Sequence, residues 1–196
     1  PLRADAARQV ALYQFLPGEP VDSGSASVGD IAQLVSFLGA LKEISGDAAS
    51  ASLGPAAEAF FTIGGVVANV RERLARLEAL DAEGASYDSL RRFLREQFAP
   101  ALQSCSERAM VGATGELAAM HRTLSPSDLG FHNSLRRPGG HLAFLDFEYF
   151  GWDDPAKTLS DCLLHPMMRL LPERKRQLRA GFDGIFGSDP GWHARV

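Results

Sequence analysis

The sequence has little cysteine and no long apolar run, and these two absences restrict the class of protein. Only two cysteines, Cys105 and Cys162, occur among the 196 residues. Two widely separated thiols do not make a disulfide scaffold or a cysteine-rich zinc site, and we expect both to be buried free thiols in a reducing compartment. No stretch reaches the roughly 20 apolar residues of a membrane span, and the N-terminal residues do not resemble a secretory signal. We therefore expect a cytoplasmic protein that has no membrane partner.

An excess of positive charge is also missing. The chain has 20 Lys and Arg residues against 24 Asp and Glu, a formal net charge of −4. Nucleic acids and anionic membranes favour basic partners, so we expect no nucleic-acid partner. The hydrophobic content of 45% and the charged content of 22% are typical of a soluble globular domain with one substantial core or two small ones.

The first two thirds of the chain are dominated by helical patterns. Residues 10–16 are an apolar run closed by Pro17 and Gly18, which predicts a buried strand. Helices are expected at about residues 27–45, where Ser27 and Asp30 resemble an N-terminal cap, and around residues 67–77. A third is expected to begin with Ser86 as its N-terminal cap and to run to about residue 105, kinked or split by Pro100.

The pattern changes after about residue 122. Short strands are expected at residues 133–136 and 141–147, around the turn sequence Pro138-Gly139-Gly140. Two more helices are expected at residues 155–164 and 173–186. The sequence therefore predicts a mostly helical α+β fold with one small β-hairpin, and the polar residues of interest lie at the ends of that hairpin.

Three of those polar residues suit phosphoryl transfer. This chemistry needs an aspartate that orients an acceptor hydroxyl, and oxygen ligands that hold Mg²⁺ against nucleotide phosphates. Asp128 lies on a loop before a strand, Asn133 follows five residues later, and Asp146 ends the second strand of the expected hairpin. A hairpin brings positions this far apart in sequence into one site. His132 and His141 lack a recognised zinc spacing, so we assign them to loop hydrogen bonding.

The segments Ser-Pro-Ser-Asp-Leu-Gly-Phe-His-Asn (125–133) and Leu-Asp-Phe-Glu-Tyr (145–149) resemble the core of the aminoglycoside phosphotransferase and choline kinase superfamily. Proteins of that superfamily have a protein-kinase-like fold, and the resemblance covers nearly the whole chain. It implies a hinge strand and linker at residues 1–22 and a helical C-terminal lobe at residues 23–196. The hairpin at about residues 123–150 would carry the catalytic loop.

The resemblance also implies residue roles and cofactors. ATP and Mg²⁺ are expected, with Asp128 catalytic and Asn133 and Asp146 as magnesium ligands. Backbone groups of three hinge residues would face the adenine: Gln14, Phe15 and Leu16. Four further residues are candidate accessory groups: Ser127, His132, Glu148 and Asp161.

Three features depart from the superfamily pattern. Pro126 and Ser127 replace the histidine and glycine that usually precede the catalytic aspartate. Thr158 stands where many relatives have a structural aspartate, and Asp161 is a candidate to replace it from the next helical turn. No glycine-rich phosphate loop or lysine-bearing strand is present, and we expect these in an N-terminal lobe encoded upstream of Pro1.

The sequence favours an ATP-dependent kinase that acts on a hydroxyl of a small molecule such as an aminoglycoside, an amino alcohol or a sugar. One alternative is a catalytically inactive, kinase-like binding or regulatory protein, motivated by Pro126 and the missing lobe. Another is a metal-dependent phosphohydrolase that uses the same acids. The sequence does not define the acceptor or the oligomeric state.

Overall fold

Helices predominate in this protein, and its strands are short and antiparallel, as predicted. The structure is a computed structural model that describes residues 2–111 and 115–196. None of the described helices is both long and apolar enough to cross a bilayer.

The first long helix, α1 (Val28–Ile44), follows the predicted pattern. The Ser27 side chain accepts a hydrogen bond from the Asp30 backbone N–H, and the Asp30 carboxylate accepts one from the Ser27 N–H. This capping box satisfies donors that the first helical turn leaves without partners. Ile31, Leu34 and Leu38 lie on one face of α1 and are fully buried.

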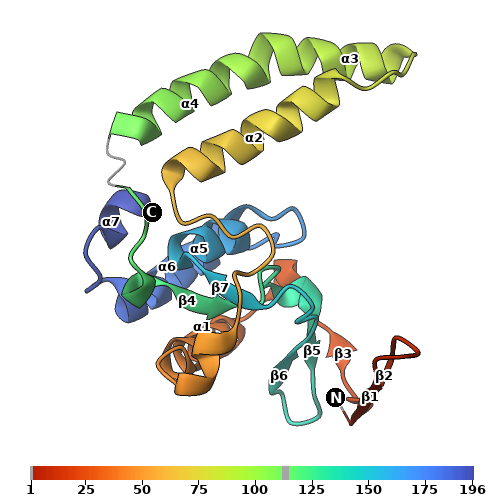
Figure 1. The fold of residues 1–196 in the computed structure, drawn as a ribbon. Helices are drawn as coiled ribbons and strands as arrows, with labels where there is room; N and C mark the ends of the chain where they lie inside the picture. Colours follow the sequence, from red (N-terminus) through yellow and green to blue (C-terminus); the bar gives the residue numbers. More distant parts are fainter. Residues whose placement is uncertain (1, 112–114) are drawn as a thin grey trace.

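The next helices form a long arm that stands away from the rest of the molecule (Figure 1). It consists of α2 (Ile63–Glu78), α3 (Ala85–Phe93), a π-helical turn (Leu94–Phe98) and α4 (Ala99–Val111). Proline has no N–H to donate, so the π turn directly before Pro100 agrees with the predicted interruption. The predicted cap at Ser86 is wrong: Gly84 precedes α3 with a φ of 113°, which glycine adopts most easily.

Three small sheets lie outside the arm in the described chain. Strand β1 (Arg3–Asp5) pairs with β2 (Val10–Leu12). Strands β3 (Glu19–Pro20), β5 (Ser134–Arg136) and β6 (Leu142–Phe144) form the second sheet, in which β5 and β6 are the predicted hairpin. Strand β4 (Thr123–Ser125) pairs with β7 (Gly151–Asp153). Short 3₁₀ turns lie at Ser23–Ser25, Ala48–Ser52, Ala119–His121 and Phe131–Asn133.

Two predictions of burial are wrong. The apolar run at residues 10–16 is exposed, with Phe15 at 86%, because in the described chain no element covers the β1–β2 hairpin or the extended segment after it. Cys105 is exposed on α4, whereas Cys162 is buried as predicted.

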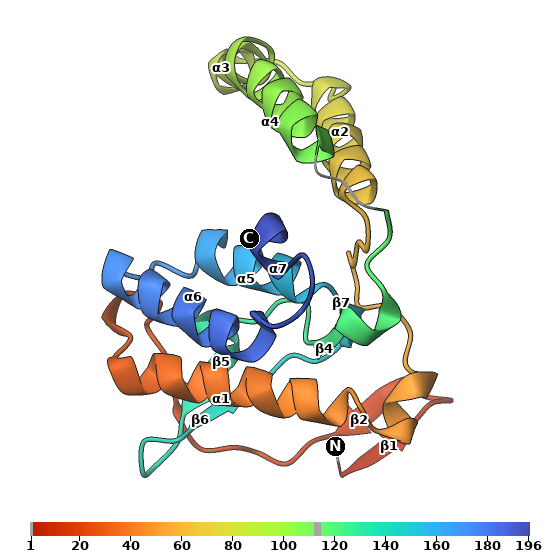
Figure 2. The same ribbon diagram turned by 90° about the vertical axis from the view of Figure 1, so that its left-hand side faces the viewer.

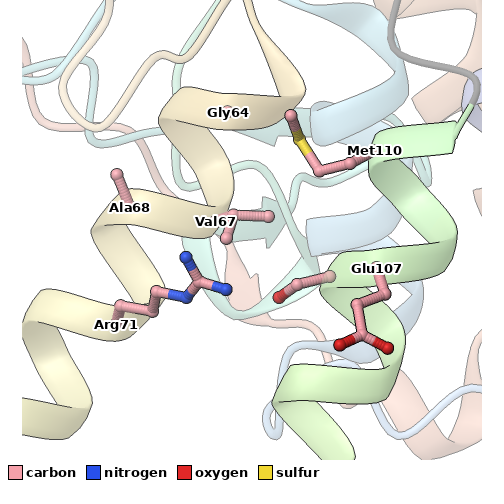
Figure 3. A pocket seen from close by; sticks show the side chains of 7 residues that line it. Gly64, Val67, Ala68, Arg71, Glu107 and Met110 are labelled. Atoms are coloured by element: carbon pink, nitrogen blue, oxygen red, sulfur yellow. The ribbon is translucent and has the colours of Figure 1, made fainter.

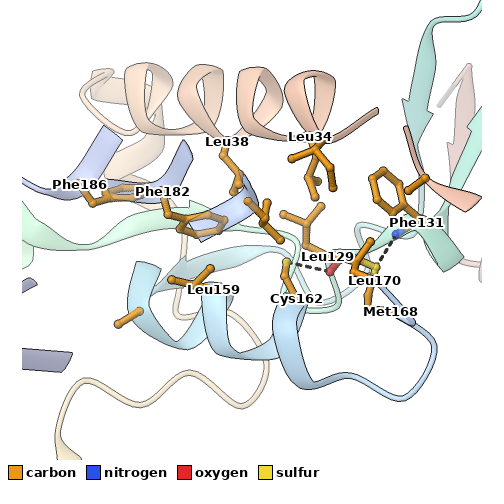
Figure 4. Close-up of a cluster of buried hydrophobic side chains, with 14 of the residues drawn as sticks. Leu34, Leu38, Leu129, Phe131, Leu159, Cys162, Met168, Leu170, Phe182 and Phe186 are labelled. Carbon is orange, nitrogen blue, oxygen red and sulfur yellow. Dashed lines mark hydrogen bonds between the residues drawn. The ribbon is translucent and has the colours of Figure 1, made fainter. Parts of the chain in front are cut away.

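The core lies between α1 and the C-terminal helices α5 (Pro155–Leu164), α6 (Pro172–Phe186) and α7 (Trp192–Arg195). Figure 2 shows α1 and α6 side by side. The side chains of Leu34, Leu38, Phe182 and Phe186 converge there (Figure 4). All residues of this cluster come from outside the arm, so the body and the arm are packed separately.

Candidate active site

A buried strand and two buried anchors fix the loop that carries Asp128. Strand β4 before the loop is fully buried, and Leu129 and Phe131 after Asp128 enter the core. Burial of each such side chain contributes about 1.5–3 kcal/mol. The Cys162 thiol donates to the Leu129 carbonyl at 3.3 Å, and the Phe131 N–H meets the Met168 sulfur at 3.2 Å (Figure 4). The loop is therefore held on both sides of the aspartate.

Ser127 turns the chain outward just before Asp128. Its φ of 70° lies in the left-handed region, which is unfavourable for a serine. Two hydrogen bonds stabilise this conformation: its N–H donates to Ser125 Oγ at 3.0 Å, and its own Oγ donates to the Ala57 carbonyl at 2.7 Å. As a result the Asp128 side chain is 45% exposed although Ser125 and Leu129 on either side of it are buried.

Asn133 and His132 hold the Asp128 carboxylate. The Asn133 Nδ2 donates both to the Asp128 carbonyl, at 3.0 Å, and to Oδ2, at 3.1 Å. His132 Nε2 lies 3.0 Å from Oδ1. Each carboxylate oxygen therefore has one partner in the protein and keeps a lone pair for a further donor. The Asn133 amide oxygen makes no hydrogen bond within the described residues, so it is free to bind a cation.

His165 joins this group, which no sequence pattern predicted. Its ring stacks on that of His132, with centroids 4.4 Å apart, and its Nε2 lies 4.0 Å from Asp128 Oδ1. The Met167 N–H donates to His165 Nδ1, so the neutral ring carries its proton on Nε2, facing Asp128. Asp128, His132 and His165 offer three metal-ligand atoms within 4.8 Å of one another. Nearly parallel rings do not aim their lone pairs at one point, so we assign the two histidines to orientation of the carboxylate.

The hairpin brings Asp146 next to Asn133. The Leu145 N–H donates to the Asn133 carbonyl at 2.9 Å, and Asp146 follows directly. Asp146 has a φ of 64° and an exposed side chain without a hydrogen-bond partner in the described residues. The pKa of Tyr149 is raised, first by its hydrogen bond to Glu148, then by the charge of Glu148, and further by the charges of Asp146 and Asp128. The negative charges of all three carboxylates therefore act on one exposed tyrosine.

The structure does not bring Gln14, Phe15 or Leu16 into contact with Asp128. These residues follow β2 in an extended segment that leads into β3, which pairs with β5 of the hairpin. Phe15 is almost fully exposed. The segment therefore reaches the same sheet as the candidate site and has no direct contact with its carboxylates.

A cleft of about 1280 Å³ opens beside Asp128, between the base of the arm and α5. Ser127, Asp128, Asp161 and His165 line it, whereas Asn133 and Asp146 lie outside its lining. Asp128 thus lies between the cleft and the two candidate magnesium ligands. A smaller cavity of about 270 Å³ lies within the arm, where Arg71 of α2 reaches toward α4 (Figure 3), and Asp128 does not line it.

Lys157 adds a charge to the cleft that was not predicted, although Asp161 follows it by four residues on α5, the spacing of a helical ion pair. Its Nζ lies 2.8 Å from Asp161 Oδ2 and 3.2 Å from Asp153 Oδ2. Burial raises the pKa of Asp153 to about 6, although the positive charge of Lys157 opposes the shift. Asp161 thus forms an ion pair with Lys157. Thr158 is buried, and its hydroxyl donates to Ser125 Oγ at 3.3 Å.

The comparison with known families agrees with this geometry. The phosphotransferase enzyme family matches residues 2–195, so the chain belongs to that family. This confirms the resemblance to the aminoglycoside phosphotransferase and choline kinase superfamily. Neither the curated proteins nor the solved structures gave a match.

Proposed function

We propose that this protein is an ATP-dependent kinase that transfers the γ-phosphate to a hydroxyl of a small molecule. Membership of the phosphotransferase family supports the reaction class. The single observation that carries the proposal is the position of Asp128, which is held by Asn133 and His132 at the edge of a large cleft. The N-terminal segment, residues 1–22, would serve as hinge, with backbone groups of Gln14, Phe15 and Leu16 toward the adenine.

In this proposal Asp128 orients the acceptor. A hydroxyl that enters from the cleft donates to the free lone pair of a carboxylate oxygen. Asp128 takes up the proton as the new O–P bond forms, while the bond between the γ-phosphorus and the bridging oxygen breaks and ADP leaves. The hydrogen bonds from Asn133 and His132 keep the carboxylate from rotating. Because positioning is the main contribution of a protein to phosphoryl transfer, these two contacts are central to the mechanism.

The donor set beside Asp128 fits magnesium. Mg²⁺ prefers oxygen ligands; the free amide oxygen of Asn133 and the exposed carboxylate of Asp146 are of that kind, and a hydrogen bond between Leu145 and Asn133 keeps them adjacent. When bound, the ion would neutralise charge on the transferring phosphates. Asp146 has no cationic partner among the described residues, so no competing ion pair has to break.

The test is phosphoryl transfer by the full-length protein. Mg-ATP and a panel of hydroxyl compounds are supplied, and ADP release is followed. We expect Asp128→Asn to lower kcat by about 10²–10⁴-fold, because the orienting carboxylate is lost. Asp47→Asn is the matched control, because Asp47 is exposed and its side chain makes no capping bond. The rate of this variant should equal that of the wild type.

Equal rates for wild type and Asp128→Asn would contradict the proposal. Failure of the wild type to bind nucleotide and to use any acceptor would favour a non-catalytic, kinase-like binding protein.

A further inference from the structure

The cleft beside Asp128 has one apolar wall and one polar wall. The apolar wall comes from the base of the arm and includes Phe60, Phe61, Ile63, Val66 and Val70. The polar wall comes from the Asp128 loop and from α5, with Lys157, Ser160 and Asp161. A ligand that fills this space has to satisfy both walls.

The acidic side chains of the cleft already have cationic partners. Glu58 Oε2 lies 2.5 Å from Arg73 Nη2. The Arg73 hydrogen bond is the main cause that lowers the pKa of Glu58; burial opposes it, and the charge of Arg73 adds to the lowering. Asp161 lies 2.8 Å from Lys157. In both pairs the cation also lines the cleft, so each local charge is compensated before a ligand arrives.

Two further acids of the lining, Asp154 and Glu116, also have cationic partners. Asp154 Oδ2 lies 3.3 Å from Arg195 Nε, and both side chains are mostly buried. Glu116 lies 2.5 Å from Arg122, whose guanidinium covers the Phe61 ring at 3.8 Å from the centroid. Glu58, Glu116, Asp154 and Asp161 are thus all paired with Arg or Lys, and Asp128 is the one acid of the described lining without such a partner.

In this arrangement the acids of the cleft contribute little binding free energy to a cationic ligand. An ammonium group that approaches Glu58 or Asp161 has to displace a tethered cation, and the displaced Arg or Lys then loses its own partner. A single uncompensated carboxylate cannot select for several positive charges. An apolar ring face, in contrast, gains binding free energy when it packs against the phenylalanine, isoleucine and valine side chains at the base of the arm.

We propose that the acceptor is an uncharged hydroxyl compound with an apolar face, such as an aryl glycoside, and not a polyamine or a polycationic sugar. The apolar face lies on the wall formed by the arm and a hydroxyl reaches Asp128. This inference rests on the proposed function for the role of Asp128, and it names the acceptor class of that same site.

The test measures binding without nucleotide, so it does not depend on turnover. Phenyl β-glucoside, methyl β-glucoside and the polyamine sugar neamine are titrated separately into the full-length protein. We expect phenyl glucoside to bind about tenfold more tightly than methyl glucoside because its ring buries apolar area, and neamine to bind more weakly than phenyl glucoside. Neamine binding as tightly as phenyl glucoside, or no measurable binding of phenyl glucoside, would overturn the inference.

A variant that removes the cationic partner of one acid provides the second measurement. Arg73→Gln removes the partner of Glu58, so the affinity for neamine relative to that for phenyl glucoside should rise about threefold. Arg76→Gln, on the same helix and outside the cleft lining, is the control and should change neither affinity. Unchanged relative neamine affinity in Arg73→Gln would also overturn the inference.

The ADP-release assay separates the acceptor class from the kinase proposal. Phenyl glucoside that binds without being phosphorylated counts against the kinase proposal, whereas phosphorylation of neamine in preference to phenyl glucoside counts against the acceptor class alone.

Discussion

At the scale of single residues, Asp30 links the first helix to the hairpin of the candidate site. Its carboxylate caps α1 through Ser27 and forms a two-point ion pair with Arg136 of β5, at 2.7 and 3.0 Å. The Asp30 side chain is only 3% exposed. The Arg136 hydrogen bond is the main cause that lowers the pKa of Asp30 to about 2, against the opposing effect of burial. One carboxylate thus serves both a helix end and a long-range contact.

The shift predicts a pH dependence of stability. Because the folded-state pKa lies below the ordinary value of 3.8, the stabilising effect is complete above about pH 5 and is lost as the pH falls through 3.8 toward 2. Asp30→Asn should therefore lower the free energy of unfolding by about 1–2 kcal/mol at pH 6. It should also flatten the decline between pH 5 and 2. Urea unfolding across this pH range measures both effects. Arg136→Gln should flatten the same interval, and a decline as steep as that of the wild type in both variants would disprove the role of the pair.

At the scale of elements, a glycine allows α6 to approach α1 closely. A methyl group added at Gly181 of α6 would lie 2.3 Å from the Val35 Cγ2 of α1, well inside contact distance. Each of the two helices supplies three buried side chains to the cluster that also contains Leu129 and Phe131. Their separation therefore affects the loop that carries Asp128.

Two substitutions in α6 should have opposite effects. Gly181→Ala should lower the free energy of unfolding by about 1–3 kcal/mol, since the helices have to separate. Gly184→Ala, three residues further on and with open space around the added methyl group, should raise it by about 0.5–1 kcal/mol because alanine favours helix. Chemical denaturation of both variants measures the difference. The same sign of change in both would contradict the close approach.

At the scale of the whole molecule, the arm is attached to the body at one place. The Leu117 N–H donates to the Phe61 carbonyl at 2.7 Å, so the two chain segments that enter and leave the arm lie side by side. The entering segment is further held to β7, because Ala56 N–H donates to the Trp152 carbonyl and Trp152 N–H donates to Gly54. The body should therefore fold without the arm.

Excision of the arm tests this separation. A variant in which a short Gly-Ser linker joins residue 62 to residue 116 should keep a cooperative unfolding transition. Its free energy of unfolding should stay within about 2 kcal/mol of that of the wild type, since the closed loop is short and the buried cluster is intact. Circular dichroism during thermal and urea unfolding measures this. A molten variant without a cooperative transition would show that the arm is needed for folding of the body.

The sequence predicted the features that depend on local pattern. The capping box at Ser27 and the β5–β6 hairpin were confirmed because turn and cap residues act within a few positions. The exposed run at residues 10–16 was mispredicted because burial depends on which element covers a strand. The stacking of His165 on His132 joins residues far apart in the sequence, and no sequence spacing predicts it. The ion pair of Lys157 with Asp161 joins residues four positions apart on α5, a spacing that does predict such a pair.

The left-handed backbone at Asp146 has a consequence for protein engineering. Aspartate in this conformation is disfavoured by about 1 kcal/mol relative to glycine, and its exposed side chain makes no hydrogen bond in the described chain that would offset this strain. A library sorted for thermal resistance alone should therefore enrich glycine at this position. The most heat-resistant clones would then be those that have discarded a proposed magnesium ligand, so any stabilisation campaign on this protein should keep residue 146 fixed.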